Sequence, residues 1–373
     1  MIMRIIQLIY SLSSGGAERF VVSLSNCLSE MGHDVEICML LDDTVEGRLF
    51  NIVFLRPGVQ IHSMKFTTGF SLSKKRKVEA YIQSKHPDVV HCHMNVIPYI
   101  YGLAYRDKSI RFIHTLHSVA ENTVRSKYQY WLNKFFYRKQ IIQPVTISKK
   151  CQESYVSFYH LDNAPYIDNG CAAVEPSSNY EKVCSEIEDL KQGKNIPVFI
   201  HVARFNMQKN QGLLIDAFNA LSEEGRKFVL LVMGNGFQTE EAMMLRNRAC
   251  QSIYFLGEKN NVSDYLLNAD AFCLTSIFEG LPISLLEALS AGVTPICTPV
   301  GGIPDVIEDG KTGYLSEDIN LSSYLSAIHR FLDCWLDSDV LKRYFENNFS
   351  MLSCAEKYLK IYYSVVNPSL VRV

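Results

Sequence analysis

The chain has 373 residues, which is too long for one ordinary domain and predicts two domains of about 150 to 200 residues each. Hydrophobic residues make up 47% of the sequence and charged residues 20%, and no apolar run approaches the roughly 20 residues of a membrane span, so a soluble globular protein is expected. The 11 cysteines are scattered without a C-x-x-C pair, which argues against a disulfide framework and favours free thiols in the cytoplasm.

Charge is nearly balanced overall but uneven along the chain. Residues 1–150 contain 20 Lys and Arg against 11 Asp and Glu, whereas the remainder contains 17 against 28. The basic run 74–77 and the basic, aromatic-rich segment 125–139 suit a peripheral contact with the cytoplasmic face of a membrane. A solvated helix face explains such runs equally well, so both interpretations stay open. No nucleic-acid partner is expected.

Short β-rich apolar runs alternate with helical patterns in the first half. A helix is predicted over residues 20–31, and strands are predicted over residues 5–10, 35–40, 89–93, 111–116 and 144–147. Strands that alternate with helices are joined by crossover connections, which produce a parallel sheet covered on both faces. The first half is therefore predicted to be a doubly wound α/β domain.

The same alternation restarts after a polar stretch at residues 170–197, which is predicted to be an irregular connection between the domains. Further strands are predicted over residues 198–202, 228–233, 253–256, 271–274 and 294–298. A closing helix with apolar residues at helical spacing follows from about residue 345. The predicted domains are thus 1–172 and 173–345, with 346–373 as a C-terminal helix that packs back on the first domain.

Ligands of open parallel sheets bind beyond the carboxyl ends of the strands, so the loops at those ends are the candidates for a site. Gly15 and Gly16 follow the first strand and open the first helix, where glycines allow close approach of the backbone and the helix N-terminus favours an anion. A plain strand-to-helix turn explains the two glycines equally well.

Four histidines raise a metal hypothesis because the His-x-His spacing places two rings on one face of a strand: His91, His93, His114 and His117. No matched acidic ligand accompanies them, so no metal is expected. His117, at the carboxyl end of its strand, is a candidate contact to a sugar. The D-x-D sequence at 337–339 lies away from any strand end and is interpreted as a chance match.

The second half offers loops that suit a diphosphate. Arg204 and Lys209 follow the strand 198–202, and two cations aimed at one diphosphate would neutralise a leaving group without a metal. Gly234 ends the next strand and permits close approach of the backbone. The loop after the third strand, with Lys259 and Val262, is predicted to pair its backbone with the edge of a nucleobase.

The most informative pattern is a pair of glutamates eight residues apart. Pro282 suits the first turn of a helix that runs to about residue 289, which places Glu279 in the preceding loop and Glu287 on the second turn. The backbone N–H groups near Gly280 and Leu281 have no intrahelical partners there and lie at the positive end of the helix dipole. An anion site flanked by two carboxylates suits a sugar nucleotide, because the N–H groups can bind its diphosphate and the carboxylates can accept hydrogen bonds from its sugar hydroxyls. Glutamates are also common at helix starts for structural reasons, so that interpretation stays open.

Together these stretches resemble glycosyltransferase family 4, over nearly the whole chain. The matching residues are 15–18, His117, Ser148, 169–170, Arg204, Lys209, Gly234, 278–282, 287–292, 301–305 and 310–314. The resemblance implies the GT-B fold, an α/β architecture of two facing Rossmann-like doubly wound parallel-sheet domains. The first domain would bind the acceptor and the second the nucleotide-sugar donor.

The resemblance also implies a retaining, metal-independent and cofactor-free transfer of a hexosyl or N-acetylhexosaminyl group from a nucleotide diphosphate, most commonly UDP. The acceptor would be a glycan or a polyprenyl-linked saccharide in bacterial surface polysaccharide synthesis. By this resemblance Glu279 and His117 contact the donor sugar, Glu287 holds the ribose, and Arg204 and Lys209 bind the diphosphate. Asp305 departs from the glutamate that many family members have there.

Two alternatives stay open at this point. A sugar-nucleotide epimerase with the same fold would act on the donor with no acceptor. A sugar-nucleotide-binding protein without catalysis would bind the donor and leave it intact.

Overall fold

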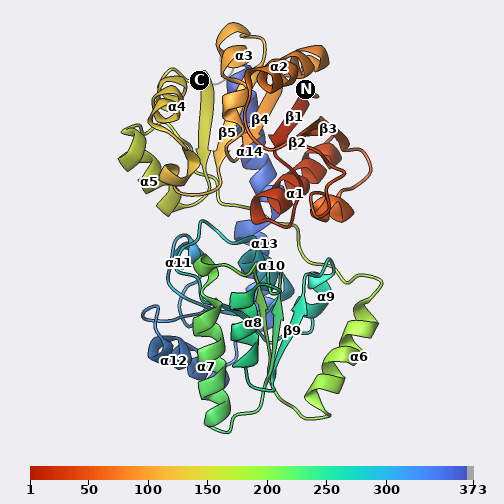
Figure 1. The fold of residues 1–373 in the computed structure, drawn as a ribbon, viewed down its shortest axis with the longest axis vertical. Coiled ribbons are helices and arrows are strands. Elements are labelled where there is room, and N and C mark those ends of the chain that lie inside the picture. The colour runs from red at the N-terminus through yellow and green to blue at the C-terminus, as the bar shows by residue number, and fades with distance from the viewer. Residues whose placement is uncertain (368–373) are drawn as a thin grey trace. The chain divides into compact units, whose positions relative to one another are not determined.

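The computed structural model describes residues 1–367 and divides the chain into two compact units (Figure 1). Unit 1 comprises Met1–Cys171 together with the C-terminal segment from Met351. Unit 2 comprises Ala172–Ser350. The division near the C-terminus lies five residues later than predicted, because the boundary expected at 345 falls inside α13 (Ser338–Phe349) and the helix breaks at Ser350, whose backbone is extended.

Unit 1 is built on a parallel sheet whose described part has six strands in the order β3-β2-β1-β4-β5-β6. The strands are β1 Arg4–Ile9, β2 Asp34–Leu41, β3 Gln60–Phe66, β4 Val89–His93, β5 Arg111–Leu116 and β6 Ile142–Thr146. The prediction missed β3. As an edge strand β3 pairs with β2 alone, and only Phe66 of its residues is buried, so it lacks the apolar run that marks a central strand.

Helices cover both faces of this sheet. They are α1 Gly16–Glu30, α2 Leu72–Lys85, α3 Tyr101–Arg106, α4 Lys127–Arg138, α5 Lys149–Tyr159 and α14 Met351–Val366, with short 3-10 turns η1 Phe50–Phe54, η2 Ile97–Tyr99 and η3 Ala120–Thr123. Among residues 1–367, no helix is both long and apolar enough to cross a bilayer. α1 starts earlier than the predicted residue 20 because Gly15 caps it with extended backbone.

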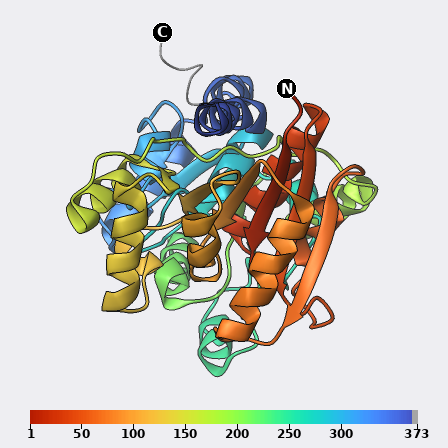
Figure 2. The ribbon, with the colours of Figure 1, turned by 90° about the horizontal axis from the view of Figure 1, so that it is seen from above.

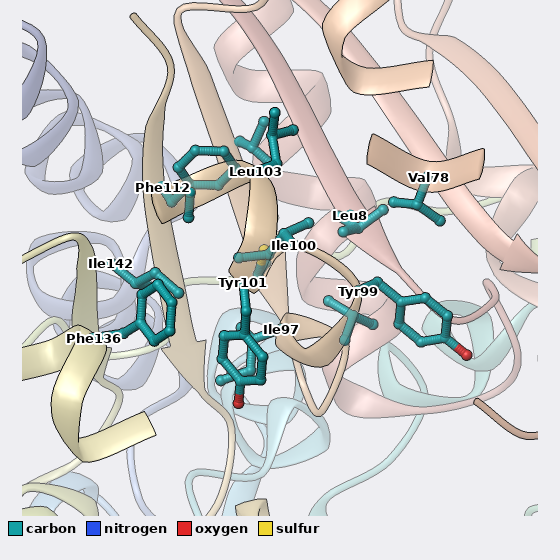
Figure 3. Packing of buried hydrophobic residues seen from close by; sticks show 14 of the residues in the cluster. Leu8, Val78, Ile97, Tyr99, Ile100, Tyr101, Leu103, Phe112, Phe136 and Ile142 are labelled. Atoms are coloured by element: carbon teal, nitrogen blue, oxygen red, sulfur yellow. The ribbon is translucent and has the colours of Figure 1, made fainter. Parts of the chain in front are cut away.

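Alternate residues of β1 enter two different cores. Leu8 joins the large cluster drawn in Figure 3, where Leu103 of α3 lies beside Phe112 of β5 and Phe136 of α4 lies beside Ile142 of β6. Ile9 points to the opposite face and packs with residues of α1 and β2 in a second cluster. Because successive side chains of a strand point to opposite faces, two buried neighbours show that the sheet is covered on both sides.

The last helix, α14, belongs to the first unit, and it can be followed in Figures 1 and 2 at the blue end of the colour range. It packs on α1 and β5. Its buried face carries Ala355, Tyr358 and Tyr362 at helical spacing. The C-terminal segment therefore completes the core that the first 171 residues begin.

Unit 2 repeats the winding of unit 1. Its described parallel strands follow the order β12-β11-β10-β7-β8-β9, which matches the first sheet when both are counted from their own first strand. The strands are β7 Val198–Val202, β8 Val229–Met233, β9 Ile253–Gly257, β10 Ala271–Leu274, β11 Thr294–Cys297 and β12 Tyr314–Leu315. The prediction missed the two-residue edge strand β12, which is too short to leave a pattern.

The helices of unit 2 correct one prediction. They are α6 Tyr180–Lys191, α7 Gln211–Glu223, α8 Glu240–Asn247, α9 Val262–Leu266, α10 Ile283–Ala291, α11 Ile303–Val306, α12 Leu321–Asp333 and α13 Ser338–Phe349, with the 3-10 turn η4 Met207–Lys209. The stretch 170–197 is not irregular throughout, because α6 occupies its middle and contacts α9. Val183 and Ile187, four residues apart, form a buried stripe too narrow to stand out among charged neighbours.

The D-x-D sequence has a structural role. The Asp337 side chain accepts hydrogen bonds from the backbone N–H groups of Asp339 and Val340 and so caps α13.

Candidate active site

The carboxyl ends of two neighbouring strands of unit 2 bring two of the predicted donor-site residues, Lys209 and Glu279, together. β7 lies beside β10 at the point where the strand order reverses, and ligands of doubly wound sheets bind in the crevice at that point. Lys209 comes from the loop after β7 and Glu279 from the loop after β10. Lys209 Nζ lies 2.5 Å from Glu279 Oε1, so the two residues form an ion pair.

Glu279 is held by one of its two carboxylate oxygens. The side chain is 6% exposed, and Ser276 Oγ donates to the same Oε1 atom at 2.6 Å. No described residue hydrogen-bonds to Oε2. The carboxylate thus keeps one oxygen as an acceptor, while the Lys209 charge offsets the cost of burying it. Sequence reasoning did not identify Ser276, because a serine three residues before a glutamate carries no distinctive signal.

The loop that carries Glu279 is tied to its neighbours by backbone contacts. Gly301 has a φ of 61°, and a Cβ there would lie 1.8 Å from the Glu279 carbonyl oxygen. The next residue, Gly302, donates its N–H to Gly280 O at 2.7 Å. From the other side, Gln208 Nε2 donates to Phe278 O at 2.8 Å. The glycine pair was visible in the sequence as part of the family resemblance, whereas Gln208 was not.

Helix α10 follows directly and supplies an anion-binding terminus. It starts at Ile283, one residue later than predicted, because Pro282 has extended backbone and takes the N-cap position. The amides of Ile283 and Ser284 lie in the first turn, where no intrahelical acceptor exists. Glu287 lies on the second turn and is half-buried. Gly280 is also half-buried, and Leu281 is buried.

The loops after β7 and β8 approach each other closely. Gly234 has a φ of 146°, and a Cβ there would lie 1.9 Å from Ala203 O, so any side chain would displace the β7 loop. Phe205 N–H donates to Asn235 O at 2.8 Å across the same contact. Arg204 is exposed, and its side chain makes no hydrogen bond or ion pair with the described residues. Its guanidinium is therefore available to a ligand, unlike the Lys209 ammonium.

Lys259 and Val262 lie farther along the sheet. Lys259 Nζ lies 5.8 Å from the centre of the Tyr265 ring, and Val262 is the first residue of α9. No hydrogen bond or ion pair among the described residues joins either one to Lys209 or Glu279. Their predicted contact with a nucleobase stays a prediction.

Gly15 and Gly16 begin α1 in unit 1. A Cβ on Gly15 would lie 2.1 Å from Glu18 Oε2, and Ser13 Oγ donates to Glu18 Oε1 at 3.1 Å. The glycine thus leaves room for a carboxylate that turns back over the first turn of the helix.

The histidines form hydrogen bonds with one another and with other polar side chains. His93, the last residue of β4, has Nδ1 3.0 Å from His117 Nε2. His91 lies between Tyr362 Oη and Thr115 Oγ1, each at 2.7 Å. Among the described residues, no group of three or more His, Cys, Asp or Glu side chains is placed to hold a metal ion. Desolvation, with a smaller contribution from His114, lowers the pKa of His117 to about 3.

Comparison with known families assigns the chain. The family Glycosyl transferases group 1 matches residues 185–348, which lie in unit 2, and Glycosyltransferase Family 4 matches residues 14–171, which lie in unit 1. The chain belongs to the group 1 glycosyltransferases of family 4. This confirms the resemblance inferred from the sequence.

Several relatives of this glycosyltransferase are known. It is 26% identical over 326 residues to the N-acetyl-alpha-D-glucosaminyl L-malate synthase of Bacillus anthracis, covering 82% of this chain and 81% of the relative. It is 26% identical over 350 residues to the UDP-Gal:alpha-D-GlcNAc-diphosphoundecaprenol alpha-1,3-galactosyltransferase of Escherichia coli. This match covers 87% of this chain and 86% of that relative. It is 24% identical over 176 residues to a glycogen synthase of Thermodesulfovibrio yellowstonii. This match covers 46% of this chain and only 35% of that relative.

The fold is also that of the family. The crystal structure of Anabaena Alr3699/HepE in complex with UDP superposes with a TM-score of 0.76 at 16% identity, covering 97% of this glycosyltransferase and 100% of that chain. The GT-B architecture predicted from the sequence is therefore confirmed.

Proposed function

We propose that this glycosyltransferase transfers a hexosyl or N-acetylhexosaminyl group from a UDP-sugar to a lipid-linked saccharide with retention at the anomeric carbon. The observation that carries the proposal is the Lys209–Glu279 ion pair at the reversal point of the second sheet. Glu279 Oε2 is left to accept a hydrogen bond from a sugar hydroxyl. The diphosphate then lies on the first turn of α10, within reach of Arg204 and Lys209, and Glu287 takes the ribose.

The charges suit a reaction without a metal. As the bond between the anomeric carbon and the phosphate oxygen breaks, negative charge collects on the leaving diphosphate, which Arg204, Lys209 and the α10 amides stabilise. The acceptor oxygen bonds to the anomeric carbon on the same face, and its proton passes to the departing phosphate oxygen. We favour this route over a covalent intermediate because Glu279, the buried carboxylate of the site, is already paired with a cation.

The identities of donor and acceptor are supported by similarity. Alr3699/HepE was crystallised with UDP, and the Escherichia coli relative is named for UDP-Gal and a diphosphoundecaprenol acceptor. A lipid-linked acceptor implies work at the cytoplasmic face of a membrane, in the synthesis of a bacterial surface polysaccharide. The Bacillus anthracis relative is named for L-malate, so a small hydroxy acid belongs in any acceptor panel.

The exposed face of α4 supports a peripheral contact with that membrane. Tyr128 and Trp131 are 73% and 64% exposed, and Phe135 lies one turn farther along the same face with Arg138 beyond it. Aromatic rings and cations on one helix face are typical of segments that lie at an anionic bilayer surface.

The run 74–77 contributes less to such a contact than its charge suggests. Lys74 Nζ is held by backbone carbonyls such as Thr67 O at 2.8 Å, and Lys75 Nζ pairs with Glu79 at 2.6 Å. Two of its four cations are therefore used within the fold.

The proposal is tested by incubating purified protein with single sugar nucleotides, with and without a polyprenyl-diphosphate saccharide. UDP release that requires both substrates supports the transfer. Conversion of the donor sugar to its epimer without an acceptor would establish the epimerase alternative instead. Donor binding with no turnover across a broad panel, including L-malate, would identify a binding protein.

A further inference from the structure

A chain of buried hydrogen bonds in unit 1 ends at His117. Gln7 on β1 and His93 on the adjacent strand β4 are both fully buried. Gln7 Oε1 lies 2.7 Å from His93 Nε2, and His93 Nδ1 lies 3.0 Å from His117 Nε2. Each ring therefore uses Nε2 to contact the previous member of the chain.

With Gln7 Oε1 facing His93 Nε2, the positions of the protons along the chain follow. An amide oxygen can only accept, so His93 Nε2 carries a proton and donates it to Gln7. Burial lowers the pKa of His93 well below its usual value, and the ring is neutral with a lone pair on Nδ1. His117 Nε2 must then donate to that lone pair. A neutral His117 consequently has no proton on Nδ1.

His117 Nδ1 lies at an accessible edge of the sheet. It makes no hydrogen bond with a described residue, and it is not among the buried side-chain atoms of residues 1–367 that lack a partner. The residue follows β5, which pairs with β4, so it lies at the carboxyl edge of the sheet, one strand from the point where β1 and β4 meet and the strand order reverses. Ligands of this fold class bind at that edge.

We infer that Gln7 and His93 are positioning residues that hold His117 in its Nε2–H form, so that Nδ1 accepts a hydrogen bond from a sugar hydroxyl. The inference rests on the proposed contact of His117 with the donor sugar. An N–H at this atom would attract phosphate oxygens as well as hydroxyl oxygens. The buried pair thus makes Nδ1 an acceptor, which suits a hydroxyl that donates and disfavours a phosphate oxygen.

If the oxygen and nitrogen of the Gln7 amide were exchanged, each hydrogen bond in the chain would run in the opposite direction. His117 Nδ1 would then carry an N–H. Gln7 Nε2 has no hydrogen-bond partner among the described residues, so the two orientations must be distinguished by experiment. Long-range proton–nitrogen correlation spectra of the full chain, labelled with ¹⁵N in its histidine rings, report the tautomer directly. The His117 signals are assigned by their loss in His117→Gln.

At pH 7 we expect Nε2 of His117 to be protonated and Nδ1 to be bare in the wild-type protein. A protonated Nδ1 would overturn the inference. Gln7→Leu removes the acceptor for His93 Nε2, so the two tautomers of His117 should then both be populated. If the leucine variant does not fold, Gln7→Met is the substitute variant. Retention of the pure Nε2–H form in that variant would refute the role of Gln7.

Thr115→Val is the matched control, because Thr115 contacts His91 in the same buried region without joining the chain to His117. It should leave the His117 tautomer and the donor KM unchanged. Gln7→Leu should raise the donor KM about twofold, because an equal mixture of tautomers leaves half of the molecules in the Nε2–H form. A mixed tautomer with an unchanged donor KM would refute the ligand contact. Absence of turnover with every donor would refute the proposed function and leave the tautomer result standing.

Discussion

Lys209 Nζ and Glu279 Oε1 lie 2.5 Å apart although 70 residues separate them in the sequence. In the proposed complex the diphosphate also contacts the Lys209 ammonium, which is then shared between the Glu279 carboxylate and the phosphate. Glu279 is then less strongly paired while the sugar hydroxyl donates to it. The ion pair therefore couples the anionic part of a donor to its sugar.

Removal of Lys209 should reduce both stability and activity. Lys209→Ala leaves the Glu279 carboxylate buried without its cation, which is expected to cost on the order of 3 to 5 kcal/mol in the free energy of unfolding. Arg204→Ala should reduce turnover without this loss, because the Arg204 side chain is exposed. Urea unfolding and initial rates distinguish the two variants. Equal stability of both would contradict the pairing.

Ser276 should affect donor binding. Ser276→Ala removes the hydroxyl that holds Glu279 Oε1 at 2.6 Å, a hydrogen bond to a charged group worth about 1.5 to 3 kcal/mol. We expect the KM for the sugar nucleotide to rise at least tenfold and the KM for the acceptor to stay the same. Steady-state kinetics with each substrate varied in turn provides the check, and a change confined to the acceptor would disprove it.

Gly301 should not tolerate a side chain. Gly301→Ala would place a Cβ 1.8 Å from the Glu279 carbonyl and is expected to reduce kcat/KM at least a hundredfold. Gly310→Ala is the matched control, because Gly310 also has a positive φ, of 76°, but its nearest neighbour would be 3.8 Å away. The control should lose only about 1 to 2 kcal/mol of stability. Similar activity of both variants would contradict a steric role.

The aromatic face of α4 should govern membrane binding. Trp131→Ser combined with Phe135→Ser removes two exposed rings and should weaken sedimentation with anionic lipid vesicles about tenfold or more. Trp335→Ser removes a ring that is 52% exposed on unit 2 and should leave vesicle binding unchanged. Equal loss in both variants would refute the assignment of the surface.

Stability should fall as the pH is lowered from 7 to 5. Burial lowers the pKa of His201 and of His114 to about 4 each, below the usual value of about 6.5 for histidine, so the unfolded chain binds protons in this range that the folded chain excludes. Each such histidine should remove about 2 kcal/mol between the two pH values. The urea midpoint at each pH measures the loss, and His201→Gln should make the dependence shallower. A flat profile would contradict neutral burial.

Much of the architecture follows from the sequence by itself. Central strands such as β1 and β7 are short, largely apolar runs, a local pattern that indicates their type and position. The loops after those strands could then be ranked by the residues that suit a sugar nucleotide. The sequence patterns did not predict the edge strands β3 and β12, because a strand that pairs with only one neighbour needs few apolar residues.

Only the tertiary structure decided how the side chains use their atoms. It placed Ser276 and Lys209 on the same oxygen of Glu279, and it joined Gln7 through His93 to His117. These contacts depend on which strands are neighbours and on their register. A local pattern of residues encodes an element, whereas the meeting of distant residues depends on how the elements pack.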